Sequence, residues 1–137
     1  LLYSFHMTQP LADNLFITNE TKLTPPKISW SEIKNTILGK KYELSLVFPT
    51  IANATELHLD WKNKPGPVNI LSFPVDKNVG EIFISLHQAK TECVKFDRKY
   101  ENYVAFLFIH GCAHLKGHIH GNEMEKYETK IRKKFNI

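Results

Sequence analysis

The sequence predicts an α/β (α+β) fold, with a single domain in which helices pack on one small mixed β-sheet of about four strands. Short segments of alternating apolar residues come first along the chain, and helical periodicity dominates from Leu86 onward. The chain has 137 residues, of which 42% are hydrophobic, enough for one compact core. Its apolar stretches are shorter than the roughly 18 residues that a membrane-crossing helix needs, so we expect no membrane contact.

The first half of the chain is predicted to alternate between strands and helices. In order, these are a strand at Asn14 to Asn19, a helix with Trp30, Ile33 and Ile37 on one face and a stop at Gly39, a strand at Tyr42 to Phe48, and a short helix from an N-cap at Thr50 to Leu57. We expect Ile51 and Leu57 to face the core. Asn63 to Pro67 (NKPGP) is predicted to be a loop, because its prolines remove backbone donors.

The second half is predicted to hold a pair of strands followed by helices. These elements are hairpin-like strands at Ile70 to Phe73 and Gly80 to Ser85, separated by Pro74, a helix at Leu86 to Lys99, a helix around Tyr103 to Leu115, and a last helix opened by a capping box of Asn122 and Glu125. The helix around Tyr103 to Leu115 is almost wholly apolar, so we expect it to be central.

The N-terminal residues have no regular pattern, and we expect a loose tail over residues 1–12 and the domain over residues 13–137. Met7 marks a candidate native start within this tail. The tail has neither a basic start nor a small-residue cleavage site, so we expect no secretory signal. Cys93 and Cys112 have no metal-binding spacing, and two free, buried thiols are typical of a reducing compartment, which favours the cytoplasm. The net charge of +4 favours an anionic partner such as nucleic acid.

Four of the seven histidines lie in one segment, HGCAHLKGHIH, at residues 110–120. On a helix, His110 and His114 lie one turn apart on the same face, so their imidazoles can converge on one metal ion. Gly117 is predicted to end this helix, and the turn after it can return a third histidine, either His118 or His120, to the same ion. Three neutral histidines with a fourth position open are typical of a catalytic zinc site.

Such a site indicates hydrolysis, because zinc lowers the pKa of bound water toward about 7 and polarises phosphoryl or carbonyl oxygens. Histidines on apolar helices are more often hydrogen-bonded core residues, but two imidazoles side by side each need a polar partner, and one cation satisfies both. Gly111 stands where metallopeptidases with the H-E-x-x-H motif carry glutamate, which disfavours a peptidase. A mid-helix glycine also indicates close approach of a backbone or ligand.

The histidine segment resembles the signature of the YbeY family of rRNA maturation factors, H-G-x-x-H-L-x-G-[YH]-x-H. VNILSFP at Val68 to Pro74 is similar to the family's T-D-V-L-S-F-P, and VGEIFIS at Val79 to Ser85 to its L-G-D-I-x-I-S. The resemblance implies one zinc ion per chain on His110, His114 and His120. It also implies a single-strand-specific endoribonuclease that acts in ribosomal RNA processing, maturation and quality control and contacts the small ribosomal subunit.

The sequence departs from the family pattern at two positions near this site. Lys62 aligns with a usual arginine, so the charge is kept while the bidentate fork that grips a phosphate is lost. We hypothesise that Lys62 neutralises phosphate charge, against the alternative of a solvated loop lysine. Ile119 replaces a usual aspartate, which puts the carboxylate that would orient a ligand histidine in question. No carboxylate in the sequence is placed as an obvious general base, so we expect proton transfer to fall to His118 or to water.

Two other functions compete with RNA cleavage. One is a zinc metallopeptidase-like hydrolase, which the paired histidines favour and the missing glutamate disfavours. The other is a non-catalytic ribosome-assembly factor whose metal is structural. Trp61 and Phe73 could stack on RNA bases, but we expect them to be core residues. The last helix carries several basic residues, and we expect them to form a solvated face and not a dedicated RNA groove. They are Lys126, Lys130, Arg132, Lys133 and Lys134.

Overall fold

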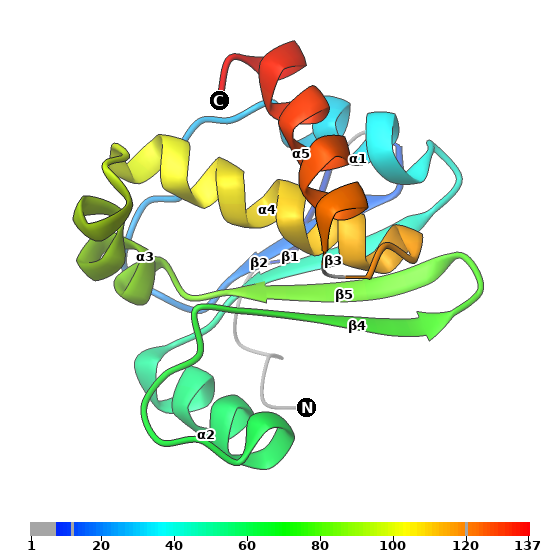
Figure 1. Cartoon of the computed structure of the whole chain (residues 1–137). Coiled ribbons are helices and arrows are strands. Elements are labelled where there is room, and N and C mark those ends of the chain that lie inside the picture. The colour runs from blue at the N-terminus through cyan, green and yellow to red at the C-terminus, as the bar shows by residue number, and fades with distance from the viewer. Residues whose placement is uncertain (1–7, 12, 120) are drawn as a thin grey trace.

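The computed structural model describes residues 8–11, 13–119 and 121–137 (Figure 1). The helices and strands are β1 (Thr8–Leu11), β2 (Leu15–Asn19), α1 (Trp30–Leu38), β3 (Glu43–Phe48), α2 (Ile51–Lys62), β4 (Ile70–Asp76), β5 (Val79–Ile84), α3 (Leu86–Glu92), the 3₁₀ helix η1 (Cys93–Phe96), α4 (Tyr100–Lys116) and α5 (Asn122–Phe135). The predicted α/β fold is confirmed. No helix in the described ranges is long and apolar enough to cross a bilayer.

The sheet is mixed and has the strand order β1-β2-β3-β5-β4. The β2–β3 and β3–β5 pairs are parallel, and the β1–β2 and β4–β5 pairs at the two edges are antiparallel. The sheet therefore has one strand more than the predicted four. The additional strand is β1, which lies in the predicted loose tail. Its sequence, TQPL, has no apolar alternation, and β1 is defined by its pairing with β2 and not by a local pattern.

The hairpin of β4 and β5 is confirmed, but β4 does not end before Pro74 and continues to Asp76. Proline is tolerated here because β4 is an edge strand with β5 as its one neighbour, so the missing backbone N–H can lie on the side without a partner strand. The pairing shifts register between Pro74 and Asp76, which marks the irregularity that the proline introduces.

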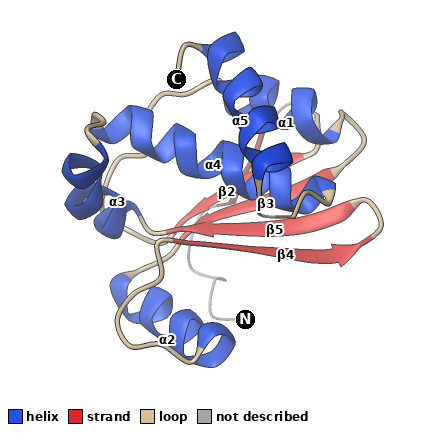
Figure 2. Cartoon of the chain, viewed as in Figure 1, coloured by secondary structure: helices blue, strands red, loops and turns tan. Residues whose placement is uncertain are grey.

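Helices cover both faces of the sheet unequally. α1, α3, α4 and α5 lie on one face, and α2 lies alone on the other (Figures 1 and 2). The main core lies between α4 and the sheet and includes Leu46, Ile82 and Phe108, each fully buried. As predicted, α4 is central, since it contacts α1, α3, α5, β4 and β5.

The second helix, α2, is longer than predicted and buries less. It continues past Leu57 to Lys62, and Ala54 is its one fully buried residue. The Oγ atom of Thr50 accepts a hydrogen bond of 3.1 Å from the backbone N–H of Asn53, which confirms the predicted N-cap. The expectation that Ile51 faces the core is wrong: its side chain is exposed, because only a narrow stripe of a lone helix reaches the sheet.

Two further boundaries differ from the prediction. The helix expected over Leu86 to Lys99 ends at Glu92 and continues as η1, and Asp97, with φ of 53°, turns the chain into α4. The capping box of Asn122 and Glu125 is also wrong. Gly121 is the N-cap of α5 and has no side chain to accept a bond, so Asn122 is already the first helical residue.

Candidate active site

The site is built on α4, which packs closely against the sheet at Gly111. A Cβ atom added to Gly111 would lie 3.0 Å from both Cδ1 of Ile70 and Oγ of Ser72. The same Oγ atom donates a hydrogen bond of 3.3 Å to the carbonyl oxygen of Gly111. The close approach predicted for this glycine is found, but the atoms against it belong to side chains of the sheet and not to a backbone or a ligand. This packing places His110 and His114, which flank Gly111 on α4, close to β4.

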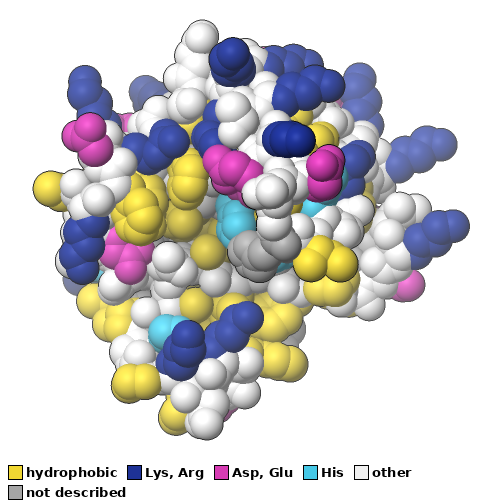
Figure 3. Space-filling model, in the orientation of Figure 1, with side chains coloured by type: hydrophobic (Ala, Val, Ile, Leu, Met, Phe, Trp, Pro, Cys, Tyr) yellow, Lys and Arg dark blue, Asp and Glu magenta, His cyan; other side chains and the backbone are white. Residues whose placement is uncertain are grey.

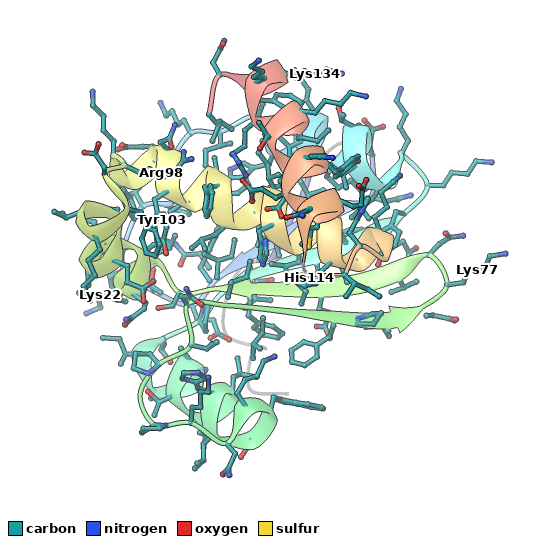
Figure 4. All side chains as sticks on the ribbon, in the orientation of Figure 1. Lys22, Lys77, Arg98, Tyr103, His114 and Lys134 are labelled. Carbon is teal, nitrogen blue, oxygen red and sulfur yellow. The ribbon has the colours of Figure 1, made fainter. Side chains whose placement is uncertain are left out.

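His110 and His114 face each other across one turn of α4. Their Nε2 atoms are 3.1 Å apart, and their ring centroids are 4.6 Å apart with the planes almost perpendicular. Both rings are partly exposed. Figure 4 shows His114 between α4 and the β4–β5 hairpin. Gly117, with φ of 107°, ends α4 after the second histidine, as the sequence predicts.

A buried carboxylate orients the first of these histidines. Nδ1 of His110 lies 3.0 Å from Oε1 of Glu128 on α5, and the Glu128 side chain is only 4% exposed. Because a carboxylate accepts and does not donate, Nδ1 of His110 carries the proton. In the neutral ring, Nε2 then presents its lone pair toward His114. α5 thus supplies an acidic partner although Ile119 replaces the family's aspartate.

Sequence reasoning missed Glu128 as part of the site. Its signal was present: Glu128 lies between Met124 and Ile131 on the apolar face of an amphipathic helix, where a charged residue needs a buried partner. Arg132, one turn later, adds a second partner, with its Nη1 atom 3.9 Å from the same carboxylate oxygen.

The histidine pair fits two ligands of a zinc ion. Zinc–nitrogen bonds of 2.0–2.1 Å in a tetrahedral site separate two ligand nitrogens by about 3.4 Å, close to the separation found here. The predicted third ligand, His120, lies outside the described residues. Within the described part of the chain, no group of three or more histidine, cysteine or acidic residues could hold a metal ion.

A cleft of about 380 Å³ opens beside the pair, between α4, β4 and the end of α2. It is lined by Lys62, Ile70, Leu71, Ser72, Pro74, His110, His114 and Leu115. Lys62 is exposed and is the last residue of α2, so the helical extension beyond Leu57 brings it to the cleft. The fold therefore places Lys62, His110 and His114 around one space.

His118 is not among the residues that line this cleft. Its ring stacks on Tyr127 of α5, with centroids 4.4 Å apart, and its backbone N–H donates to the carbonyl oxygen of Ala113. Trp61 is exposed, so the expectation of a core residue is wrong; its ring lies 4.9 Å from that of Phe73, which is partly buried.

The two cysteines are free and buried, as expected. Cys112 is completely buried on α4, and burial raises the pKa of its thiol well above the usual range. The thiol therefore stays protonated and acts as a packing group, which agrees with its predicted role.

Fold and site together define a class of protein. It is an α/β domain with a mixed sheet, and its central helix presents to a cleft a pair of histidines, one of them oriented by a carboxylate. The family model described as Endoribonuclease YbeY matches residues 17–136. The chain therefore belongs to the YbeY family.

Individual relatives agree with this assignment. The chain is 33% identical over 103 residues to Endoribonuclease YbeY of Agrobacterium fabrum, an alignment that covers 65% of this chain and 61% of the relative. It is also 33% identical over 109 residues to the protein of the same name from Phytoplasma australiense, covering 69% and 76%. The chain thus spans about three fifths of the length of the Agrobacterium relative.

A solved structure shares the fold. The solution structure of a protein from Thermotoga maritima superposes with a TM-score of 0.53 at 22% identity, and the match covers 77% of this chain and 78% of the other. This likeness supports the architecture of the sheet and its helices.

Proposed function

We propose that this protein is a metal-dependent endoribonuclease that cleaves single-stranded ribosomal RNA, with one zinc ion per chain on His110, His114 and His120. The observation that carries the proposal is the pair of Nε2 atoms 3.1 Å apart beside a cleft, with Glu128 fixing the proton of His110 on the opposite ring nitrogen. Bound zinc supplies Lewis acidity for hydrolysis of a phosphodiester.

The residues around the cleft have separate roles in this proposal. Lys62 neutralises the charge of the phosphate that enters the cleft, as a point charge without a bidentate fork. Glu128 is a positioning residue that holds His110 in one orientation. His118 and water are the two candidates for proton transfer, and water is favoured because His118 stacks on Tyr127 away from the cleft lining.

The competing peptidase is disfavoured by the packing of α4. A metallopeptidase needs glutamate at the position of Gly111, where even a Cβ atom would come within 3.0 Å of Ile70 and Ser72. The proposed substrate also agrees with a net charge of +4. Contact with the small ribosomal subunit and a cytoplasmic location belong to the same proposal and are supported by the family and by two free thiols.

The test compares the wild-type chain with His114→Ala and with His87→Ala as the matched control, a histidine on α3 that lines none of the described cavities. Folding is measured by circular dichroism, zinc by elemental analysis, and cleavage on single-stranded and duplex RNA of the same sequence. We expect His114→Ala to fold, to lose zinc and to lose cleavage of the single strand. If the wild type binds zinc, hydrolyses no RNA and needs His114 only to fold, the metal is structural and the proposal is wrong.

A further inference from the structure

A second cavity of about 390 Å³ shares His110 and Ile70 with the cleft and lies between α4, α5 and η1. We call it the aromatic cavity; it is lined by Asn69, Ile70, Phe96, Tyr103, Phe106, Leu107, His110, Gly121, Met124, Glu125 and Glu128. In Figure 3, hydrophobic side chains gather between α3 and α5, next to acidic side chains. The volume lies within the range of small-molecule sites, roughly 300–1,000 Å³.

One wall of this cavity is a row of three nearly parallel rings. The rings of Phe96 and Tyr103 are stacked at a centroid distance of 5.2 Å, and those of Tyr103 and Phe106 at 6.0 Å, with interplanar angles of 15° and 14°. Phe96 is 54% exposed at the rim, whereas Tyr103 is buried. Tyr103 lies between the other two rings and Phe106 is covered by arginines, so the exposed ring of Phe96 is the surface on which a flat ligand such as a nucleobase can stack.

The polar groups of the cavity select what enters it. Glu125 and Glu128 place two carboxylates on the α5 side, which disfavours a phosphate inside the cavity. Oε1 of Glu128 already accepts from His110 and Oε1 of Glu125 from Arg132, so the second oxygen of each carboxylate is the acceptor that an amino group would meet. Asn69 and Tyr103 are held in place, because the Asn69 amide and the Tyr103 hydroxyl both donate to Oε1 of Glu92, at 3.2 and 3.1 Å. The cavity therefore suits a base with an exocyclic amino group.

Positive charge lies just outside the aromatic wall. The Cζ atoms of Arg98 and Arg132 are 4.4 and 5.1 Å from the ring centroid of Phe106. Burial, and then the nearby charge of Arg132, lower the pKa of Arg98. Arg98 also lines an open hollow of about 410 Å³ together with Phe96 and Lys99. Arg132 is already paired with Oε1 of Glu125 at 3.1 Å, whereas Arg98 donates to the neutral amide of Asn102, so Arg98 is the guanidinium that gains from an anion beside it.

The three spaces form one track. The cleft and the aromatic cavity share His110, and the aromatic cavity shares Phe96 with the hollow at Arg98. Along the track the lining changes from Lys62 and histidines, to aromatic rings with carboxylates, to Arg98 and Lys99 with one carboxylate, Asp97. This order alternates groups that bind phosphate with groups that bind a base, which matches the repeat of a nucleic acid strand.

We propose that the aromatic cavity binds one amino-bearing nucleobase of the RNA strand, next to the phosphodiester at the histidine pair, and that Arg98 binds a phosphate farther along. This proposal rests on the proposed function, because the scissile phosphodiester at the histidine pair fixes which part of the RNA strand reaches the cavity. The binding of a nucleotide to the cavity can be measured without cleavage.

The experiment uses adenosine 5′-monophosphate, uridine 5′-monophosphate and adenosine as probes, titrated into ¹⁵N-labelled protein and followed by NMR. We expect adenosine 5′-monophosphate to shift the amide signals of Phe96 and Asn69 and to bind more tightly than the uridine nucleotide, which has no amino group. Phe96→Ala is expected to weaken this binding about tenfold, from the loss of one stacking contact. Val94→Ala is the matched control, since Val94 also lies on η1, is 79% exposed and does not line the cavity.

A second variant keeps the proposal testable if Phe96→Ala perturbs η1. Arg98→Gln should weaken the binding of adenosine 5′-monophosphate and leave that of adenosine unchanged. Equal affinities for the nucleotide in wild type, Phe96→Ala and Arg98→Gln, or shifts confined to residues around His114, would overturn the assignment.

The two proposals fail in different ways. If RNA is cleaved by the wild type and by Phe96→Ala with the same KM, and the nucleotide leaves the Phe96 signal unmoved, the cavity assignment is wrong and the nuclease stands. If no RNA is cleaved while the nucleotide binds in a Phe96-dependent manner, the nuclease is wrong and the cavity is a nucleotide site.

Discussion

Nδ1 of His110 lies 3.0 Å from Oε1 of Glu128, and this contact joins the candidate site on the central helix to the last helix. The carboxylate is buried, so it is satisfied only by groups that α4 and α5 bring to it. The proton on Nδ1 leaves Nε2 available toward His114. The orientation of the histidine pair therefore depends on how α5 docks.

Replacing Glu128 by glutamine tests this dependence. We expect Glu128→Gln to fold and to bind zinc about 10- to 100-fold more weakly, because partners that orient ligand histidines typically contribute that much. Zinc affinity is measured by competition with a chromophoric chelator. Glu123→Gln is the control, since that side chain is on the same helix and 89% exposed. Equal zinc affinity in both variants and the wild type would remove Glu128 from its positioning role.

Two substitutions of Lys62 separate the effect of its positive charge from the effect of its side-chain shape. Lys62→Ala should lower the rate of single-stranded RNA cleavage by about tenfold or more, because a charge-assisted contact to the phosphate is lost. Lys62→Arg should retain the rate or raise it, since the guanidinium adds a bidentate fork. Lys64→Ala is the control, as Lys64 is exposed in the next loop and does not line the cleft. Cleavage by Lys62→Ala at the wild-type rate means that Lys62 is a solvated lysine.

The close packing of α4 on β4 predicts a large effect at Gly111. Gly111→Val places three carbon atoms where a Cβ alone would lie 3.0 Å from Ile70 and Ser72, so these side chains or the helix itself must shift. We expect the free energy of unfolding, measured in urea, to fall by roughly 1–3 kcal/mol. Lys130→Val, at an exposed helical position, controls for the lower helix propensity of valine. A Gly111→Val protein as stable as that control would contradict the packing.

Tyr103 predicts a pH dependence of stability. Burial, and then the neighbouring Glu92, raise the pKa of Tyr103 from 10.0 to about 12. Between these two values the unfolded chain releases the phenolic proton and the folded chain keeps it, so stability falls as pH rises, by up to about 1.4 kcal/mol per pH unit. Urea unfolding of wild type and Tyr103→Phe between pH 9 and 11.5 measures this.

The Tyr103→Phe variant should be about 1 kcal/mol less stable at neutral pH, because the hydrogen bond to Glu92 is lost. Its deficit should shrink as the pH rises above 10. A deficit that stays constant over this range would mean that Tyr103 titrates alike in the folded and unfolded chains.

Local patterns predicted most of the elements. Leu44, Leu46 and Phe48 alternate in sequence and are all buried in β3, and Trp30, Ile33 and Ile37 recur at helical spacing and form the buried face of α1. The failures occur where neighbours along the chain do not decide the outcome. β1 exists through its pairing with β2, and Ile51 is exposed because only one narrow stripe of α2 reaches the sheet.

The sequence by itself determined the histidine pair, because helical periodicity places His110 and His114 on one face wherever the helix lies, and it determined the glycine that lets this helix approach the sheet. Only the tertiary structure decided that Glu128 orients His110, that Lys62 reaches the same cleft and that Phe96 and Tyr103 form a wall beside it. The physical reason is the separation along the chain between the residues that make each contact. Side chains a turn apart are set by backbone geometry, whereas contacts between distant elements depend on how whole faces pack together.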